Sequence, residues 1–426
     1  MRVFFQDSTV NKTMAKIIPF RGILYNVSKV SMEDVLAPPY DVITPGYREA
    51  LYMQSPYNIV RIDFGKEKPG DDETDNKYTR ARKYLDGWVE EGIFIRSDKP
   101  SFYVYEMSYT VNYLRKRLLG FLCLVKLEEL GKGSVYPHEC THSKPKEDRL
   151  NLLRSCEANT SPIFSLYKSP EGKISGILSK ISATRPYIEA SDIGGDIHRL
   201  WQISDAEEIK IIAKELEDRP VFIADGHHRY ETAFEFFRET SSKKIPTSAG
   251  PVDHVLMFLA NMLDEGITIL PAHRLIKEIP ENMETILSEY FETEQVTGDF
   301  DIKKKLAGKS RVFGFYRNGS ESWHLLTFKG GDLPEVPHHL REIDVFILHE
   351  LILKRTSIRT TDIGYEMDVD KTLDKVMSGE FRAAFFLNPT RVGDVEKAAL
   401  SSVRMPPKST YFYPKLLTGL VINKFS

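Results

Sequence analysis

The residues best suited to chemistry form one short run, Asp-Gly-His-His-Arg, at positions 225–229. Arg229 offers a planar fork that matches phosphate or carboxylate, and His227 and His228 can donate, accept or carry a proton near neutral pH. Asp225 can act as a base or contact a metal ion. The run therefore predicts a site for an anion with acid–base groups beside it.

The flanking segments would position this run. Residues 221–224 are short and apolar enough for a buried strand, and Ala233, Phe234 and Phe237 recur at helical spacing. Gly226 lies at the break, where the missing Cβ allows a sharp turn and a close approach of a ligand to the backbone. The helix that follows would point its free N–H groups and its positive dipole end at that space, which also favours an anion.

Two other interpretations of the run are weaker. A zinc site is disfavoured, because neighbouring side chains such as His227 and His228 point apart at a helix start, and we predict no protein-held metal. The run could instead be a helix cap. A cap needs one polar side chain, whereas this run carries four polar groups where the chain makes room for a partner.

A second polar stretch, at 136–149, precedes a predicted helix with Ser143 as its N-cap and Pro145 in its first turn. We expect residues 138–149 to fold over 225–229, since both stretches are rich in anion-binding groups. Glu139 and Asp148 are candidates for a second carboxylate, with Glu139 the preferred catalytic one. The phosphate-binding candidates in this stretch are His138, Thr141, Lys144, Lys146 and Arg149. Weaker candidates of the same kind are Arg274, Lys408, Ser409 and Thr410.

Composition narrows the class of protein. The chain has 426 residues, 41% hydrophobic and 28% charged, which is typical of folded globular proteins. Lys plus Arg number 58 against 61 Asp plus Glu, so the net charge of -3 argues against nucleic acid or an anionic membrane as a partner. No segment reaches the ~18 unbroken apolar residues that span a bilayer. Three cysteines without metal or disulfide spacing favour a reducing cytoplasm.

Over nearly its whole length the chain resembles a bacterial and archaeal family known as domain of unknown function 1015. The run from Asp225 to Tyr230, followed by Ala233, also resembles the phosphate-binding motif of the ParB and sulfiredoxin superfamily, which includes the ADP-dependent free serine kinases. In those proteins the motif lies early in a compact domain, whereas about 220 residues precede it here. The blocks that carry the resemblance to the first family are 37–42, 138–149, 158–163, 224–230, 270–274 and 405–415.

This resemblance implies an α/β fold with mixed α+β sheets in three segments. Residues 1–197 would form an N-terminal α/β region, 198–275 a ParB/sulfiredoxin-like core, and 276–426 a C-terminal α/β region.

The residue pattern also predicts local structure within the first segment. Residues 55–62 have the pattern of an extended strand, and residues 78–92 have that of an amphipathic helix.

The resemblance also implies a function. The turn at 225–229 would hold the phosphates of ADP or ATP, with Mg²⁺, and a phosphoryl group would pass to the hydroxyl of a small metabolite. The alternative is a regulatory protein that binds a nucleotide through the same turn without transfer. A scaffold protein is a third possibility, and it would show no thermal shift with nucleotide.

Overall fold

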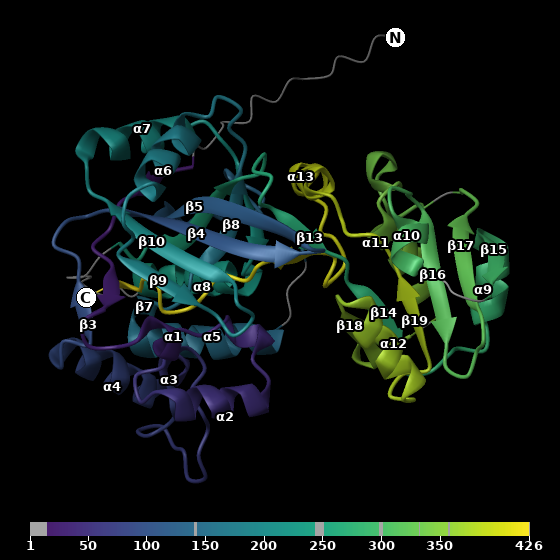
Figure 1. The fold of residues 1–426 in the computed structure, drawn as a ribbon, viewed down its shortest axis with the longest axis horizontal. Coiled ribbons are helices and arrows are strands. Elements are labelled where there is room, and N and C mark those ends of the chain that lie inside the picture. Colours follow the sequence, from purple (N-terminus) through teal and green to yellow (C-terminus); the bar gives the residue numbers. More distant parts are fainter. Residues whose placement is uncertain are drawn as a thin grey trace. The chain divides into compact units, whose positions relative to one another are not determined.

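The mixed α/β class expected from the sequence is confirmed by the computed structural model (Figure 1). The chain divides into two compact units. Unit 1 comprises the described parts of Met1–Pro137, Thr141–Ile267 and Pro414–Ser426, and unit 2 those of His138–Cys140 and Thr268–Tyr413. The residues that the structure describes are 15–139, 143–242, 251–297, 301–331, 333–356 and 358–425.

Unit 1 is built on a mixed sheet with the strand order β6-β11-β8-β12-β5-β4-β10-β9, and β1 pairs with β5. The pairs β11–β6 and β12–β8 are parallel, and the other pairs are antiparallel. Segments 1–197 and 198–275 both supply strands to this sheet. The division of the chain into three domains at residues 197 and 275 stays a prediction. The strands are β1 (Ile17–Ile18), β4 (Phe102–Val111), β5 (Leu114–Lys126), β6 (Val135–Tyr136), β8 (Ile163–Tyr167), β9 (Ile188–Ser191), β10 (Ile197–Ile203), β11 (Val221–Asp225) and β12 (His254–Asn261).

Strand β12 is apolar along nearly its whole length, and β4 and β5 are buried except near the ends that join them, as expected for strands covered on both faces. On one face Phe121, Met257 and Ile223 join a core with residues of α5 (Ser143–Cys156), α6 (Lys173–Ser182), α7 (Ala206–Leu216) and α8 (His227–Ser242). On the other face Tyr105 and Phe164 each pack their rings against Phe258. In Figure 1, α6 and α7 lie side by side.

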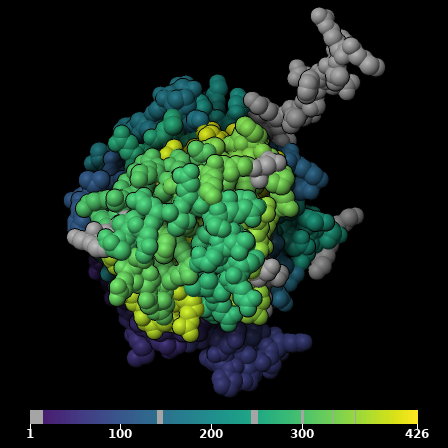
Figure 2. All heavy atoms as spheres, turned by 90° about the vertical axis from the view of Figure 1, so that its right-hand side faces the viewer, coloured from purple at the N-terminus to yellow at the C-terminus, as the bar shows by residue number. Residues whose placement is uncertain are grey.

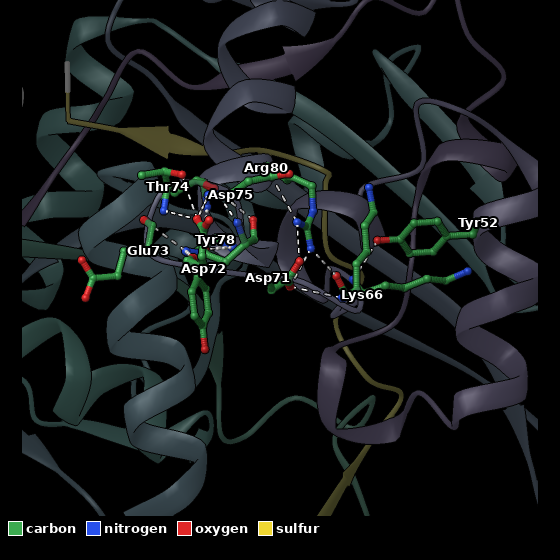
Figure 3. A network of polar contacts seen from close by, with 12 residues as sticks. Tyr52, Lys66, Asp71, Asp72, Glu73, Thr74, Asp75, Tyr78 and Arg80 are labelled. Carbon is green, nitrogen blue, oxygen red and sulfur yellow. Dashed lines mark hydrogen bonds and ion pairs between the residues drawn. The ribbon is translucent and has the colours of Figure 1, made fainter.

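The charged stretch before α4 (Lys77–Glu90) is held by that helix (Figure 3). Both oxygens of Asp71 accept hydrogen bonds from the guanidinium of Arg80, at 2.7 and 2.9 Å. Asp72 accepts hydrogen bonds from the backbone N–H groups of Thr74 and Asp75, so its carboxylate stabilises the conformation of the loop. These contacts fix the start of α4, which packs against α5.

One local prediction is wrong: part of the extended pattern at 55–62 is the short helix α3 (Val60–Asp63). The side chain of the buried Asn58 causes the change. Its Oδ1 accepts a hydrogen bond from the N–H of Val60 at 3.0 Å, and its Nδ2 donates to the carbonyl of Asp34 at 2.8 Å. The remaining short elements of unit 1 are α1 (Met32–Val35), α2 (Pro45–Gln54), β2 (Ile23–Tyr25), β3 (Phe94–Arg96), β7 (Ala158–Asn159) and β21 (Asn423–Lys424).

Unit 2 contains an antiparallel sheet with the strand order β15-β17-β16-β19-β14-β18. The atoms of unit 2 are coloured green to yellow in Figure 2. Alternate residues serve two cores: Phe385 packs with α9 and α11, whereas Phe386 packs with α10 and α12. A small ladder joins β13 (Thr268–Leu270) to β20 (Tyr411–Tyr413). The other strands and α-helices are β14 (His273–Ile276), β15 (Phe291–Val296), β16 (Val312–Arg317), β17 (Trp323–Phe328), β18 (Ile363–Glu366), β19 (Ala383–Phe386), α9 (Met283–Tyr290), α10 (Ile302–Leu306), α11 (Asp344–Leu348), α12 (Val369–Met377) and α13 (Val392–Leu400).

Within the described ranges, no helix combines the length and apolar character needed to cross a lipid bilayer.

Candidate functional site

The predicted strand, turn and helix around residues 225–229 are confirmed in unit 1. Strand β11 pairs with β8, and its register shifts between Ile223 and Asp225, which re-aims the strand end as β-bulges do. Gly226 follows with a φ of 95°, a conformation that other residues adopt only with strain. Its carbonyl accepts the hydrogen bond from the N–H of Tyr230 at 3.1 Å, so α8 begins directly after the turn.

The side chain of Arg229 folds back over the turn. A Cβ built on Gly226 would lie only 2.9 Å from Arg229 Nε, so the guanidinium occupies the space that the glycine leaves. Arg229 Nη1 donates to the carbonyl of Pro162. Within the described part of the chain, no carboxylate lies at ion-pair distance from this partly exposed guanidinium. The turn therefore holds a cation whose charge is not neutralised by a described side chain.

Asp225 is held by a residue that the sequence analysis did not select. Lys415 Nζ lies 2.8 Å from Asp225 Oδ2, and both side chains are mostly buried. The only sequence signal for Lys415 is its place at the end of the block 405–415. The ion pair brings the C-terminal segment of unit 1 to the turn.

The two histidines after Gly226 have different surroundings. His227 is buried, whereas His228 is partly exposed. Their difference in exposure fits the expectation that neighbouring side chains at a helix start point apart.

Helix α5 brings two of the candidates from 138–149 next to α8. Lys146 Nζ lies 2.6 Å from Glu231 Oε2 on α8. Arg149 is buried, donates from Nη1 to the carbonyl of Asp63 at 2.7 Å, and lies 3.5 Å from Asp63 Oδ1. Thr141 lies outside the described residues, and the side chain of Lys144 is likewise not described.

Tyr40 is a further residue that the sequence prediction left out. The guanidinium of Arg149 lies 4.1 Å from the centre of the Tyr40 ring, in cation–π geometry. Burial raises the pKa of the Tyr40 phenol to about 12, although the charges of Arg149 and Arg229 oppose the rise. Tyr40 thus lies within the field of both arginines and keeps its proton at neutral pH.

Six further candidates gather in unit 2. His138 Nε2 lies 2.9 Å from Thr410 Oγ1, and Glu139 accepts a hydrogen bond from the N–H of Lys408. Arg274 is buried and donates from Nη2 to the carbonyl of Lys408 at 3.3 Å, and burial lowers its pKa to about 10. Ser409 donates to the carbonyl of Pro406 at 2.6 Å. The structure therefore places the sequence candidates in two groups, one in each unit.

Asp148 anchors the arginine that packs on Tyr40. Arg149 Nη2 and Lys77 Nζ lie 2.6 and 2.7 Å from its two oxygens, and the Tyr78 hydroxyl donates to it at 3.0 Å. Burial alone would raise the pKa of Asp148, but the charges and hydrogen bonds of Arg149 and Lys77 outweigh it and lower the pKa to about 2.

Asp148→Asn is expected to reduce the unfolding free energy by about 2 kcal/mol at pH 7. Because the folded-state pKa lies below the usual 3.8, the carboxylate stabilises the fold above about pH 4 and loses this effect as the pH falls toward about 2. Urea unfolding followed by tryptophan fluorescence should show a shallower loss of stability for the variant in this window. An unchanged slope would show that Asp148 is not the linked group.

Among the residues described, no group of three His, Cys, Asp or Glu side chains is placed to hold a metal ion.

Comparison with known proteins identifies the family. The family described as "Protein of unknown function (DUF1015)" matches residues 17–346, so the chain belongs to this family. No curated protein matches the sequence.

Several solved structures are similar to the chain, and three proteins among them illustrate the likeness. A conserved hypothetical protein from Pyrococcus furiosus is 15% identical, with 66% of this chain and 87% of that chain covered and a TM-score of 0.34. A free serine kinase in complex with AMP is 14% identical, with 66% and 83% covered and a TM-score of 0.36. SbnI with C-terminal truncation from Staphylococcus aureus is 12% identical, with 70% and 85% covered and a TM-score of 0.36.

Proposed function

We propose that this DUF1015 protein is a nucleotide-dependent phosphotransferase, which uses ADP or ATP and transfers a phosphoryl group to a small metabolite that bears a hydroxyl. The observation that carries the proposal is the turn of unit 1. There an arginine without a described carboxylate partner, a glycine at positive φ and the start of a long helix come together. All three features favour a bound phosphate.

Phosphate binding would use the backbone as well as Arg229. The first N–H groups of a helix lack intrahelical acceptors and carry the positive end of the dipole. Because Gly226 has no Cβ, the Arg229 guanidinium lies directly beside the turn, so an anion at the helix start would contact this cation and the N–H groups together. The free donors of the Arg229 fork would then contact phosphate oxygens, as guanidinium groups commonly do.

Transfer would use the acid–base groups beside the turn. Asp225 would accept the proton of the attacking hydroxyl, whose oxygen bonds to the terminal phosphorus while the bond from that phosphorus to AMP (from ADP) or ADP (from ATP) breaks. Lys415 would orient the Asp225 carboxylate through the ion pair. His227 or His228 would donate to phosphate oxygens. Since Arg149 is engaged with Asp63 and Asp148, we assign it the positioning of Tyr40 rather than direct phosphate contact. The candidates in unit 2 are left out of this proposal, because their described contacts are made within that unit.

The described residues do not form an all-protein metal site, but this does not conflict with Mg²⁺ bound mainly through the nucleotide. Mg²⁺ commonly binds to one or two carboxylates together with substrate phosphates. Asp225 is the carboxylate at the turn that could serve as such a ligand. When bound, the ion would neutralise charge on the transferred phosphoryl group.

A binding-only regulatory role is the second candidate function, and one observation favours it. The Asp225 carboxylate is held by Lys415, and an ion-paired carboxylate is a weaker proton acceptor. The protein would then bind a nucleotide through the same turn and transmit the bound state to a partner.

Arg229→Ala is expected to weaken ADP binding by roughly tenfold to a hundredfold, because a charge-assisted fork contributes about 1.5–3 kcal/mol. Calorimetric titration of the full chain measures the affinity, and circular dichroism checks the fold. Arg238→Ala is the matched control, since Arg238 lies on the same helix, is mostly exposed, and is 3.9 Å from Glu235. Equal affinities of folded Arg229→Ala and the wild type would exclude the turn as the phosphate site.

A further inference from the structure

A cavity of about 190 Å³ lies in unit 1 among α1, α2, the turn after β9 and the C-terminal segment, and residues 225–229 do not line it. A cavity of ~150 Å³ is large enough to hold benzene, so this one suits a small organic molecule. Leu51 and Leu417 contribute to its apolar walls, and its polar side chains come from Glu33, Tyr47, Gln54, Ser191 and Asp192.

The polar lining of this cavity is acidic. Glu33 and Asp192 contribute carboxylates, and no Lys, Arg or His is among the lining residues. Glu33 Oε1 accepts a hydrogen bond from the N–H of Ser191 at 3.4 Å. Across the described ranges, neither carboxylate has a Lys or Arg at ion-pair distance. Two carboxylates therefore share one small cavity that no described Lys or Arg side chain neutralises.

A buried histidine, His198, lies behind the lining residue Asp192. His198 is fully buried, and its Nδ1 lies 2.7 Å from the hydroxyl of Tyr105, which also accepts from the N–H of Leu417. Because the Tyr105 hydroxyl accepts from Leu417, it donates its own hydrogen to Nδ1 of His198, and the ring proton of His198 is then on Nε2. His198 Nε2 has no hydrogen-bond partner among the described residues and faces Asp192 Oδ2 at 3.5 Å.

Hydrogen bonds stabilise the ionised form of the Asp192 carboxylate. Its Oδ1 accepts hydrogen bonds from the N–H groups of Gly194 and Asp196, both at 2.9 Å. Burial would raise its pKa, but His198 and these backbone groups outweigh burial and lower the pKa. The cavity therefore keeps a fixed negative charge at neutral pH, and an anionic occupant would be repelled.

We propose that this cavity is a binding site for a small organic cation, a primary ammonium group carried on a short apolar body. The ammonium would lie between Asp192 and Glu33, and the apolar body would contact Leu51 and Leu417. Such a ligand would supply the positive charge that the lining residues lack, and its small size matches the volume. The site is independent of the phosphate turn, so each can be tested without the other.

The test uses n-propylammonium chloride as the probe on the full chain, with methyl NMR to locate binding. Saturable shifts are expected at Leu51, Leu417 and Ile193 with a Kd at or below about 10 mM, while Ile223 in β11 stays unchanged. n-Propanol and propionate have the same carbon skeleton without the positive charge, and they should bind at least about tenfold more weakly.

Asp192→Asn keeps the oxygen that accepts from the backbone and removes the charge, so it should fold and bind the probe at least about tenfold more weakly. Glu129→Gln, at an exposed carboxylate paired with Lys132, is the control and should bind like the wild type. The proposal is overturned if the wild type shows no saturable shifts at these methyl groups, if n-propanol binds as well as the ammonium, or if Asp192→Asn binds as well as the wild type.

Discussion

Asp225→Asn is expected to lower the rate of phosphoryl transfer by at least ~100-fold while nucleotide binding largely persists. The amide keeps the size and one oxygen acceptor of the carboxylate, so Lys415 can still donate to it. It removes the negative charge that would accept the hydroxyl proton. Calorimetry with ADP and ATP measures binding, and ³¹P NMR detects phosphorylated products across a panel of small hydroxyl compounds.

Glu235→Gln on α8 is the control for the loss of a carboxylate near the turn, because Glu235 is about half exposed and makes a long ion pair with Arg238. It should bind and transfer like the wild type. If Asp225→Asn is fully active, Asp225 is not the base. Unfolding of this variant would instead favour a capping role. Nucleotide binding by the wild type without transfer to any acceptor would favour the regulatory alternative.

Gly226→Ala is expected to weaken ADP binding by about a hundredfold or more, a larger effect than truncating Arg229. The new Cβ would lie 2.9 Å from Arg229 Nε, so it would displace the guanidinium from the turn and leave a methyl group where that cation now lies. The φ of 95° adds backbone strain of about 1–2 kcal/mol, which should lower the melting temperature by a few degrees. Calorimetric titration and thermal unfolding measure the two effects.

Gly172→Ala separates strain from site chemistry. Gly172 has a φ of 72° at the start of α6, and a Cβ there would meet no atom within 4 Å. This control should lose stability to a similar degree and keep its affinity for ADP. If both variants bound ADP like the wild type, the turn would not be in contact with the ligand.

The turn could be predicted from sequence because its signals are local. The apolar run before Asp225, the glycine, and the helical spacing of Ala233 and Phe237 all lie within a short window, and the structure has β11 and α8 at these places. The structure of residues 55–62 could not be predicted in the same way. Their sequence pattern is extended, but hydrogen bonds of the buried Asn58 side chain start a short helix there.

The partners of the turn could not be predicted, because long-range packing decides them. Lys415 and Asp225 are 190 positions apart, and no local pattern couples them. The density of charge around Arg149 indicated an anion site, yet its guanidinium is engaged with the main chain of Asp63, 86 positions away, and packs over Tyr40. Charge density alone does not distinguish a buried structural cation from one that is left to bind a ligand.

The most direct test of the central claim is a crystal structure of the full chain with ADP bound. We predict that phosphate oxygens lie about 3 Å from the N–H groups that follow Gly226 and from the guanidinium of Arg229. ADP bound elsewhere, with Gly226 and Arg229 free of contact with it, would contradict the assignment of this turn as the phosphate site.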